Sequence, residues 1–188
     1  MSAAITSPQS GVSIANDLNS GFLSRALLTQ VSRPAILLGR LLTDMSMVVA
    51  QSLIVIIVAI AMGVRISYGL PGILLILLTV AFFELSFSGI FLAIGMRTRK
   101  TETISALAGF LYFPLIFLSS AMFPTSFFPS WVQTISNYNP VSYVSDVLRE
   151  LVQGGLTLST LVFAYTVIGI IAIVTFAATL YQFRKVIS

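Results

Sequence analysis

The chain reads FPTSFFPSWVQTISNYNPVSYVSDVLRELVQGG at residues 123–155, a stretch that holds three of its seven prolines and its only tryptophan. Proline removes a backbone donor and breaks a helix interior, so this stretch does not cross a bilayer as one helix. Pro129 and Pro140 each suit the first turn of a new helix, and Gly154-Gly155 suits a helix end. We therefore predict two short helices, one after Pro129 and one from Pro140 to Gln153.

The composition around this stretch indicates an integral membrane protein. Hydrophobic residues make up 57% of the 188 residues and charged residues 9%, whereas soluble domains are about 45–50% apolar and about 25% charged. The chain has no cysteine and no histidine, which excludes thiolate metal sites and removes the commonest general base and metal ligand. With no recognisable activated nucleophile, an enzyme is not expected.

Four apolar segments are long enough to cross about 30 Å of hydrocarbon as helices. We predict membrane spans at residues 45–64, 72–95, 103–122 and 158–181. Pro114 is expected to kink the third span. Small residues four apart, as in Ser105/Gly109, would let helix backbones approach closely, although chance explains them equally well. No internal repeat or linker is visible, so residues 1–188 are interpreted as one domain.

Basic residues are distributed unevenly between the loops that alternate across these spans. Eight of the ten fall on one side: Arg25, Arg33, Arg40, Arg97, Arg99, Lys100, Arg184 and Lys185. The other two are Arg65 and Arg149. The positive-inside rule then predicts a multi-pass protein of the cell membrane with both termini in the cytoplasm. Because the basic residues flank apolar runs instead of forming a patch, the net charge does not indicate nucleic-acid binding.

By the same rule, residues 123–155 lie on the outer side. Their aromatic side chains, Phe127, Phe128, Trp131 and Tyr138, suit the headgroup layer of a bilayer. We expect a re-entrant helical hairpin that dips into the outer interface, where non-helical backbone is tolerated only if protein or water covers it.

Residues 17–42 precede the first predicted span and carry apolar side chains at helical spacing. Ser32-Arg33-Pro34 interrupts the pattern, because the residue before proline is disfavoured in a helix. We predict a short amphipathic helix, a break, and a second helix that runs into the first span. Two interpretations stand: a helix held on the anionic inner leaflet by its arginines, or a docking element for a cytoplasmic partner.

Two separated motifs resemble the membrane subunit of type 2 ABC exporters, in particular the daunorubicin-resistance-like permeases. One motif is FLSSAMFPTSFFPSWVQTISNYNPVSYVSDVLRELVQGG at residues 117–155, with its Phe-Pro turn, Pro-x-Trp, Asn-Pro and Asp-x-x-Arg. The other is NDLNSGFLSRALLTQVSRPAILLGRLLTD at residues 16–44, which is similar to the coupling segment of that family. The resemblance covers nearly the whole chain in the expected order.

The resemblance implies two sets of functional residues and several partners. Residues expected to couple the chain to an ATPase are Phe22, Leu23, Arg25, Leu27, Leu28 and Arg33. Residues expected to form the outer re-entrant segment and gate are Phe123, Pro124, Pro129, Trp131, Asn139, Pro140, Asp146 and Arg149. An ABC ATP-binding subunit and a second permease chain, identical or different, would complete the transporter in the lipid bilayer.

The chain shows no phosphate-binding loop of its own. It contains no GxxxxGK[ST] motif, and its only lysines, Lys100 and Lys185, each follow an arginine. ATP and Mg²⁺ are therefore expected to bind in the partner ATPase, and this chain is expected to hold no cofactor and no metal. Members of the family usually have six transmembrane helices, so the first two are expected to be absent here, by truncation or because another chain supplies them.

Glu84 lies near the middle of the second predicted span, where a charge costs roughly 2.5–3.5 kcal/mol on insertion scales. It is either neutralised by Ser86, Ser88 or a neighbouring helix, or it faces a substrate path with these serines and helps to bind a cationic amphiphile. Asp146, Arg149 and Glu150 raise a similar choice, since their spacing allows either a local ion pair or an outer gate.

The sequence thus predicts an all-α, polytopic membrane protein with four transmembrane helices, a coupling helix and an outer re-entrant hairpin. The expected function is that of a permease subunit of an ATP-driven exporter for a hydrophobic drug-like or lipid-like substrate. Export of a polysaccharide or lipid-linked glycan is the alternative within the family. Outside it stand an ion-coupled secondary transporter, which usually needs several intramembrane ionisable groups, and a structural membrane subunit.

Overall fold

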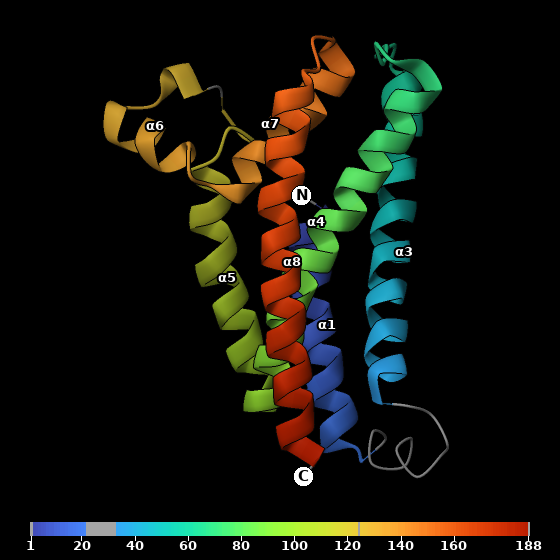
Figure 1. Ribbon diagram of the computed structural model, residues 1–188, viewed down its shortest axis with the longest axis vertical. Helices are drawn as coiled ribbons and strands as arrows, with labels where there is room; N and C mark the ends of the chain where they lie inside the picture. Colours follow the sequence, from blue (N-terminus) through green and yellow to red (C-terminus); the bar gives the residue numbers. More distant parts are fainter. Residues whose placement is uncertain (1, 22–32, 124, 188) are drawn as a thin grey trace.

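The computed structural model describes residues 2–21, 33–123 and 125–187, and every regular element within these residues is helical (Figure 1). The long helices are α1 Ser2–Asn19, α3 Arg33–Ala61, α4 Gly69–Thr98, α5 Thr101–Phe117, α7 Pro140–Gln153 and α8 Leu158–Ile187. The short ones are η1 Thr125–Phe127 and α6 Ser130–Ser136. The predicted all-α fold class is confirmed, and so are the two short helices after Pro129 and Pro140.

Within the described part of the chain, three helical segments are long and apolar enough to cross a membrane: Ala35–Ala61, Gly69–Thr98 and Leu158–Gln182. They correspond to the first, second and fourth predicted spans. The first begins at Ala35 and not at Met45, and the charged side chains of its early turns have partners from other helices. Arg40 pairs with Asp17 of α1 at 2.7 Å, and Asp44 is buried among hydroxyl groups.

The third predicted span, 103–122, is too long. Helix α5 continues through Pro114 but ends at Phe117, so it is a shorter apolar helix of 17 residues, about 26 Å in length. It stops because the side-chain Nδ2 of Asn139 donates to the carbonyls of Leu115 at 2.7 Å and Leu118 at 3.2 Å. The last carbonyls of a helix have no backbone N–H of the same helix to accept from, so they need partners from elsewhere.

Helix α1 is an element that the sequence analysis did not predict. It is rich in small and polar residues and contains Pro8, yet it packs mainly against α4 and also contacts α3 and α5. Ser7, Ser10, Ile14 and Ala15 are all at most 1% exposed. Helix α4 is the centre of the fold, because α1, α3, α5, α7 and α8 all contact it.

The bundle has two opposite ends (Figure 1), and the residues at these ends differ in charge and in aromatic content. The basic end holds the turn between α4 and α5, with Arg97, Arg99 and Lys100, together with the start of α3 and the end of α8. The aromatic end holds residues 62–68 and the region from α5 to α8 with its short helices η1, α6 and α7. This arrangement matches the alternation of loops inferred from the sequence.

Candidate functional site

Most of the predicted coupling residues fall within residues 22–32, which lie outside the described residues. Phe22, Leu23, Arg25, Leu27 and Leu28 belong to that stretch, and Arg33 is described only as the first residue of α3. The helices on either side are linked to each other and to the turn beyond α4. Asp17 of α1 pairs with Arg40 of α3 at 2.7 Å, and Asn19 Nδ2 donates to the carbonyl of Arg99 at 2.9 Å. These two contacts tie the C-terminal part of α1 to α3 and to the turn after α4.

Helix α1 and helix α4 cross with their backbones almost in contact. A Cβ on Gly95 would lie 2.4 Å from the carbonyl oxygen of Gly11, and a Cβ on Gly11 would lie 2.5 Å from that of Phe91. Only glycine at both positions permits this approach, as in other close helix crossings. The Ser105/Gly109 pair makes no such crossing within the described part of the chain, since a Cβ on Gly109 would meet nothing within 4 Å there.

The crossing brings two buried carboxyl groups beside the hydroxyls of α1. Ser7 Oγ donates to Glu84 Oε2 at 2.8 Å, and Ser10 Oγ donates to Asp44 Oδ2. Ser88 Oγ lies 3.1 Å from the same Asp44 oxygen. This polar seam, formed by Ser7, Ser10, Asp44, Glu84 and Ser88, joins α1, α3 and α4, and it offsets the cost of leaving polar groups unpaired in an apolar bundle.

The structure does not bring Glu84, Ser86 and Ser88 together as one path. Glu84 and Ser88 are four apart and face α1 and α3, whereas Ser86 faces the other way and donates to Ile168 of α8 at 3.0 Å. Glu84 is 0% exposed and takes its hydrogen bond from a neighbouring helix. A role in binding a cationic amphiphile stays a prediction.

Sequence reasoning missed Asp44, Ser7 and Ser10. An ionisable residue inside a span marks a site by default, and that signal would have singled out Asp44 if the span had been started at Ala35. No comparable signal exists for the serines, whose role depends on residues far along the chain.

At the aromatic end, Asn139 is the residue that organises the turn. Its Oδ1 accepts from Val141 N at 2.9 Å and so caps α7, while its Nδ2 closes α5. The other predicted residues in this region are spread along the segment. Phe123 and Trp131 are exposed, Pro129 precedes α6, Pro140 begins α7, and Pro124 lies outside the described residues.

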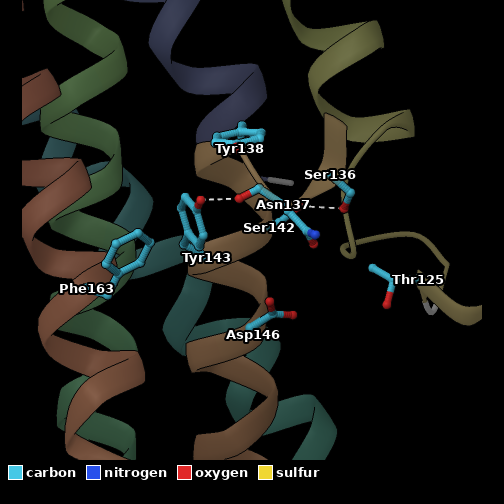
Figure 2. Close-up of a pocket in the computed structure, with 8 residues that line it drawn as sticks. All are labelled: Thr125, Ser136, Asn137, Tyr138, Ser142, Tyr143, Asp146 and Phe163. Atoms are coloured by element: carbon cyan, nitrogen blue, oxygen red, sulfur yellow. Dashed lines mark hydrogen bonds between the residues drawn. The ribbon is translucent and has the colours of Figure 1, made fainter. Parts of the chain in front are cut away.

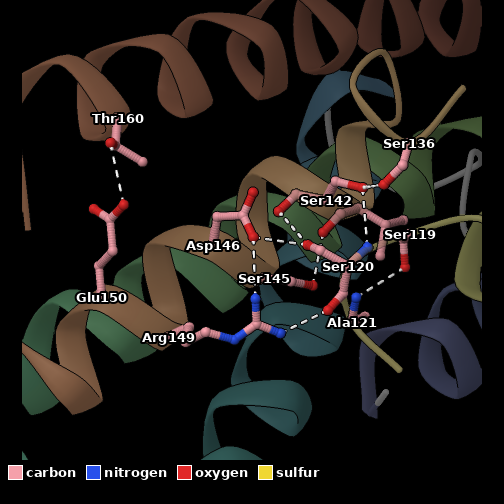
Figure 3. Close-up of polar contacts among 11 residues, drawn as sticks. Ser119, Ser120, Ala121, Ser136, Ser142, Ser145, Asp146, Arg149, Glu150 and Thr160 are labelled. Atoms are coloured by element: carbon pink, nitrogen blue, oxygen red, sulfur yellow. Dashed lines mark hydrogen bonds and ion pairs between the residues drawn. The ribbon is translucent and has the colours of Figure 1, made fainter. Parts of the chain in front are cut away.

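Asp146 and Arg149 of α7 hold the turn that follows α5 (Figure 3). Ser120 Oγ donates to Asp146 Oδ1 at 2.7 Å, and Arg149 Nη2 donates to the Ser120 carbonyl at 2.7 Å. The Arg149–Asp146 pair itself is looser, at 3.4 Å. Glu150, on the same helix, reaches α8 instead, where it accepts from Thr160 Oγ1 at 3.3 Å. The ion pair therefore exists, but its stronger contacts are with Ser120.

A pocket of about 410 Å³ opens beside this cluster, between η1, the end of α6, α7 and α8 (Figure 2). Its lining residues are Thr125, Ser136, Asn137, Tyr138, Ser142, Tyr143, Asp146 and Phe163. Its volume falls in the range of roughly 300–1,000 Å³ that is usual for small-molecule sites. Of these residues the sequence analysis had named only Asp146 as a site residue.

Comparison with known families gives a match to the ABC-2 type transporter over residues 1–153. The chain belongs to this family. It is 29% identical over 144 residues to a daunorubicin resistance ABC transporter permease protein of Streptomyces coeruleorubidus, which covers 77% of this chain and 51% of that protein. A probable doxorubicin resistance ABC transporter permease protein of Mycobacterium tuberculosis is 24% identical over 169 residues, or 86% of this chain and 59% of that protein.

The chain thus spans between half and three fifths of the length of these relatives. No solved structure gives a significant match to it. Family membership and the apolar helices α3, α4 and α8 together make this a multi-pass membrane protein of the ABC-2 permease type.

Proposed function

We propose that this chain is the membrane-spanning permease subunit of an ATP-driven exporter that moves a hydrophobic drug-like or lipid-like substrate out of the cytoplasm. The observation that carries the proposal is the ABC-2 family match over residues 1–153. The resistance permeases among its relatives support the substrate class. The basic end of the bundle would face the cytoplasm.

ATP would be hydrolysed by a separate ABC subunit that docks on residues 22–32. The lack of a phosphate-binding loop in this sequence supports that division. The Asp17–Arg40 ion pair between α1 and α3 supports a transfer of movement from residues 22–32 to both helices. Docking would displace two helices at once, and α1 would carry the displacement along α4 into the middle of the bundle.

A second permease chain would pack on the exposed face of α5. Phe110 and Phe113 of that helix are 80% and 65% exposed, and Phe113 stacks on Phe117 with ring centroids 5.9 Å apart. Large aromatic side chains at this exposure suit either lipid or a partner helix. The partner assignment is tested by crosslinking Phe113→Cys, since the natural chain has no cysteine.

The proposal is tested by isolating the chain from its native membrane and identifying the proteins that come with it. Changing Leu23 and Leu27 to Asp should release a Walker-A ATPase, because both lie on the predicted apolar face of the coupling helix. The matched control changes Thr29 and Gln30 to Asp on the polar face, and it should retain the ATPase. If the intact chain brings no ATPase, the exporter assignment is wrong.

The substrate class needs a separate assay. Inverted vesicles that contain the complex should accumulate a hydrophobic cationic dye when ATP is added. A complex that holds the ATPase but moves neither this dye nor a labelled lipid would keep the permease assignment and reject the substrate class.

A further inference from the structure

The pocket at the aromatic end has walls that the fold fixes in place. Ser136 and Ser142 are 1% and 3% exposed, and their hydroxyls lie 3.0 Å apart. The Tyr143 hydroxyl donates to the backbone carbonyl of Asn137, and the Tyr143 ring meets Phe163 edge to face, with centroids 4.9 Å apart. A ligand would therefore meet a preformed site and would not have to order these side chains (Figure 2).

Several polar groups of the pocket are left for a ligand. Among the described residues, the side-chain amide of Asn137 and the Oδ2 atom of Asp146 have no hydrogen-bond partner, although Asp146 Oδ1 is held by Ser120. The amide offers two donors and an acceptor, and the carboxylate oxygen offers an acceptor. An apolar ligand that covered these groups would remove their water without replacing its hydrogen bonds, so the polar part of the lining favours a ligand that can hydrogen-bond.

The charge of the site favours a neutral ligand. Asp146 is the only carboxyl group among the lining residues, none of which is a lysine or arginine, and Arg149 Nη1 lies 3.4 Å from its Oδ1. A cationic ligand would compete with Arg149, and an anionic one would be repelled by Asp146. A neutral group that both donates and accepts hydrogen bonds satisfies the lining without disturbing the pair.

Exposed aromatic rings lie in the pocket lining and on the elements next to it. Tyr138 is 81% exposed and belongs to the lining, and Trp131 and Phe127, at 63% and 79%, lie on the adjacent α6 and η1. Such rings occur in the headgroup layer of membranes. A sugar ring has two faces of C–H groups and a rim of hydroxyls. An aromatic ring can stack on one of those faces, and amide and carboxylate groups beside it can hydrogen-bond the hydroxyls.

We propose that this pocket binds a neutral polyhydroxylated group, either a free sugar ring or the sugar headgroup of a glycosylated lipid. Asn137 and Asp146 Oδ2 hydrogen-bond its hydroxyls, and Tyr138 covers one face of the ring. The site lies at the aromatic end and does not depend on the proposed transport function.

The test uses the chain with its accompanying subunits, purified without sugar-based detergent and placed in phosphatidylcholine nanodiscs. Saturation-transfer NMR would measure binding of methyl β-glucoside and of tetramethylammonium, and native mass spectrometry would measure retention of a glucosyl diacylglycerol. We expect binding of methyl β-glucoside or of the glucosyl lipid that does not weaken as salt is raised, because a neutral ligand is not screened.

Asn137→Ala and Tyr138→Ala should each weaken that binding roughly three- to tenfold, the effect of losing one or two good contacts. Both side chains are exposed, so the thermal unfolding followed by Trp131 fluorescence should stay unchanged. Tyr181→Ala, an equally simple loss of an exposed tyrosine on α8, is the matched control and should bind like the wild type.

The outcomes separate the possible ligands. Binding of methyl β-glucoside and of the lipid supports a site for the sugar ring itself, and binding of the lipid alone supports a headgroup site that needs the membrane anchor. Binding of tetramethylammonium alone, with strong salt dependence, overturns the proposal in favour of a cation site. No binding of any probe, or sugar binding that the Asn137 and Tyr138 variants leave unchanged, also overturns it.

Discussion

Asn139 connects two helices through different atoms of one side chain, and this gives a sharp test of the fold at the aromatic end. Its Oδ1 caps α7 by accepting from Val141 N, and its Nδ2 donates to the last carbonyls of α5. Aspartate is as good an N-cap as asparagine, but its carboxylate has no donor. Asn139→Asp and Asn139→Ala therefore separate the cap from the connection to α5.

The alanine variant loses the cap and both donated bonds. A cap is worth about 1 kcal/mol and each net hydrogen bond about 1 kcal/mol, so the expected loss is about 3 kcal/mol. At about 2–4 °C per kcal/mol for a chain of this size, the unfolding temperature should fall by about 6–12 °C. The aspartate variant keeps the cap but faces the carbonyl oxygens of Leu115 and Leu118 in a site that is 5% exposed. It should be at least as destabilised as the alanine variant.

Thermal unfolding of the detergent-solubilised chain would be followed by the fluorescence of Trp131, the only tryptophan, and by circular dichroism of the whole bundle. Asn137→Ala is the control, because its side chain has no hydrogen bond within the described residues and should unfold like the wild type. If Asn139→Asp is as stable as the wild type, only the cap matters, and the bonds donated by Asn139 are not the reason that α5 ends early.

Four further substitutions, three at the centre of the bundle and one control on α5, are followed by the same unfolding assay. Gly95→Ala should destabilise by about 1–3 kcal/mol, because its Cβ would lie 2.4 Å from a backbone oxygen of α1. Gly109→Ala, in open space, should instead gain up to about 1 kcal/mol, and equal effects would contradict the close crossing. Thr179→Val removes a hydrogen bond of 2.8 Å to the Gly89 carbonyl and should cost about 0.6 kcal/mol, the average for such bonds in membranes; a loss several times larger would show that α4 and α8 depend on it. Glu84→Gln keeps an acceptor for α1, so it should change the unfolding temperature by less than about 2 °C and affect export of cationic and neutral substrates equally. A selective loss of cationic export would place Glu84 on the substrate path.

Residues that act locally made the aromatic end predictable. Proline restricts its own φ and cannot donate, so Pro129 and Pro140 fixed where α6 and α7 begin. Gly154 ends α7 with a φ of 94° that suits glycine. The sequence could not show that Asn139 also ends α5, because its donors bind carbonyls more than twenty residues earlier. That contact explains why the predicted third span was five residues too long.

What the sequence determined by itself is the membrane class, the long apolar helices and the charge difference between the two ends, since each depends on composition or on short-range pattern. Only the tertiary structure decided the place of α1. Its small, polar residues carry no hydropathy signal, and its burial rests on partners such as Glu84, which lies 77 residues from Ser7. A helix with this composition is stable in the middle of a bundle because other helices supply a backbone groove at Gly95 and acceptors at Asp44 and Glu84. The groove and the acceptors form only when α3 and α4 pack against α1, so the sequence of α1 alone does not reveal them.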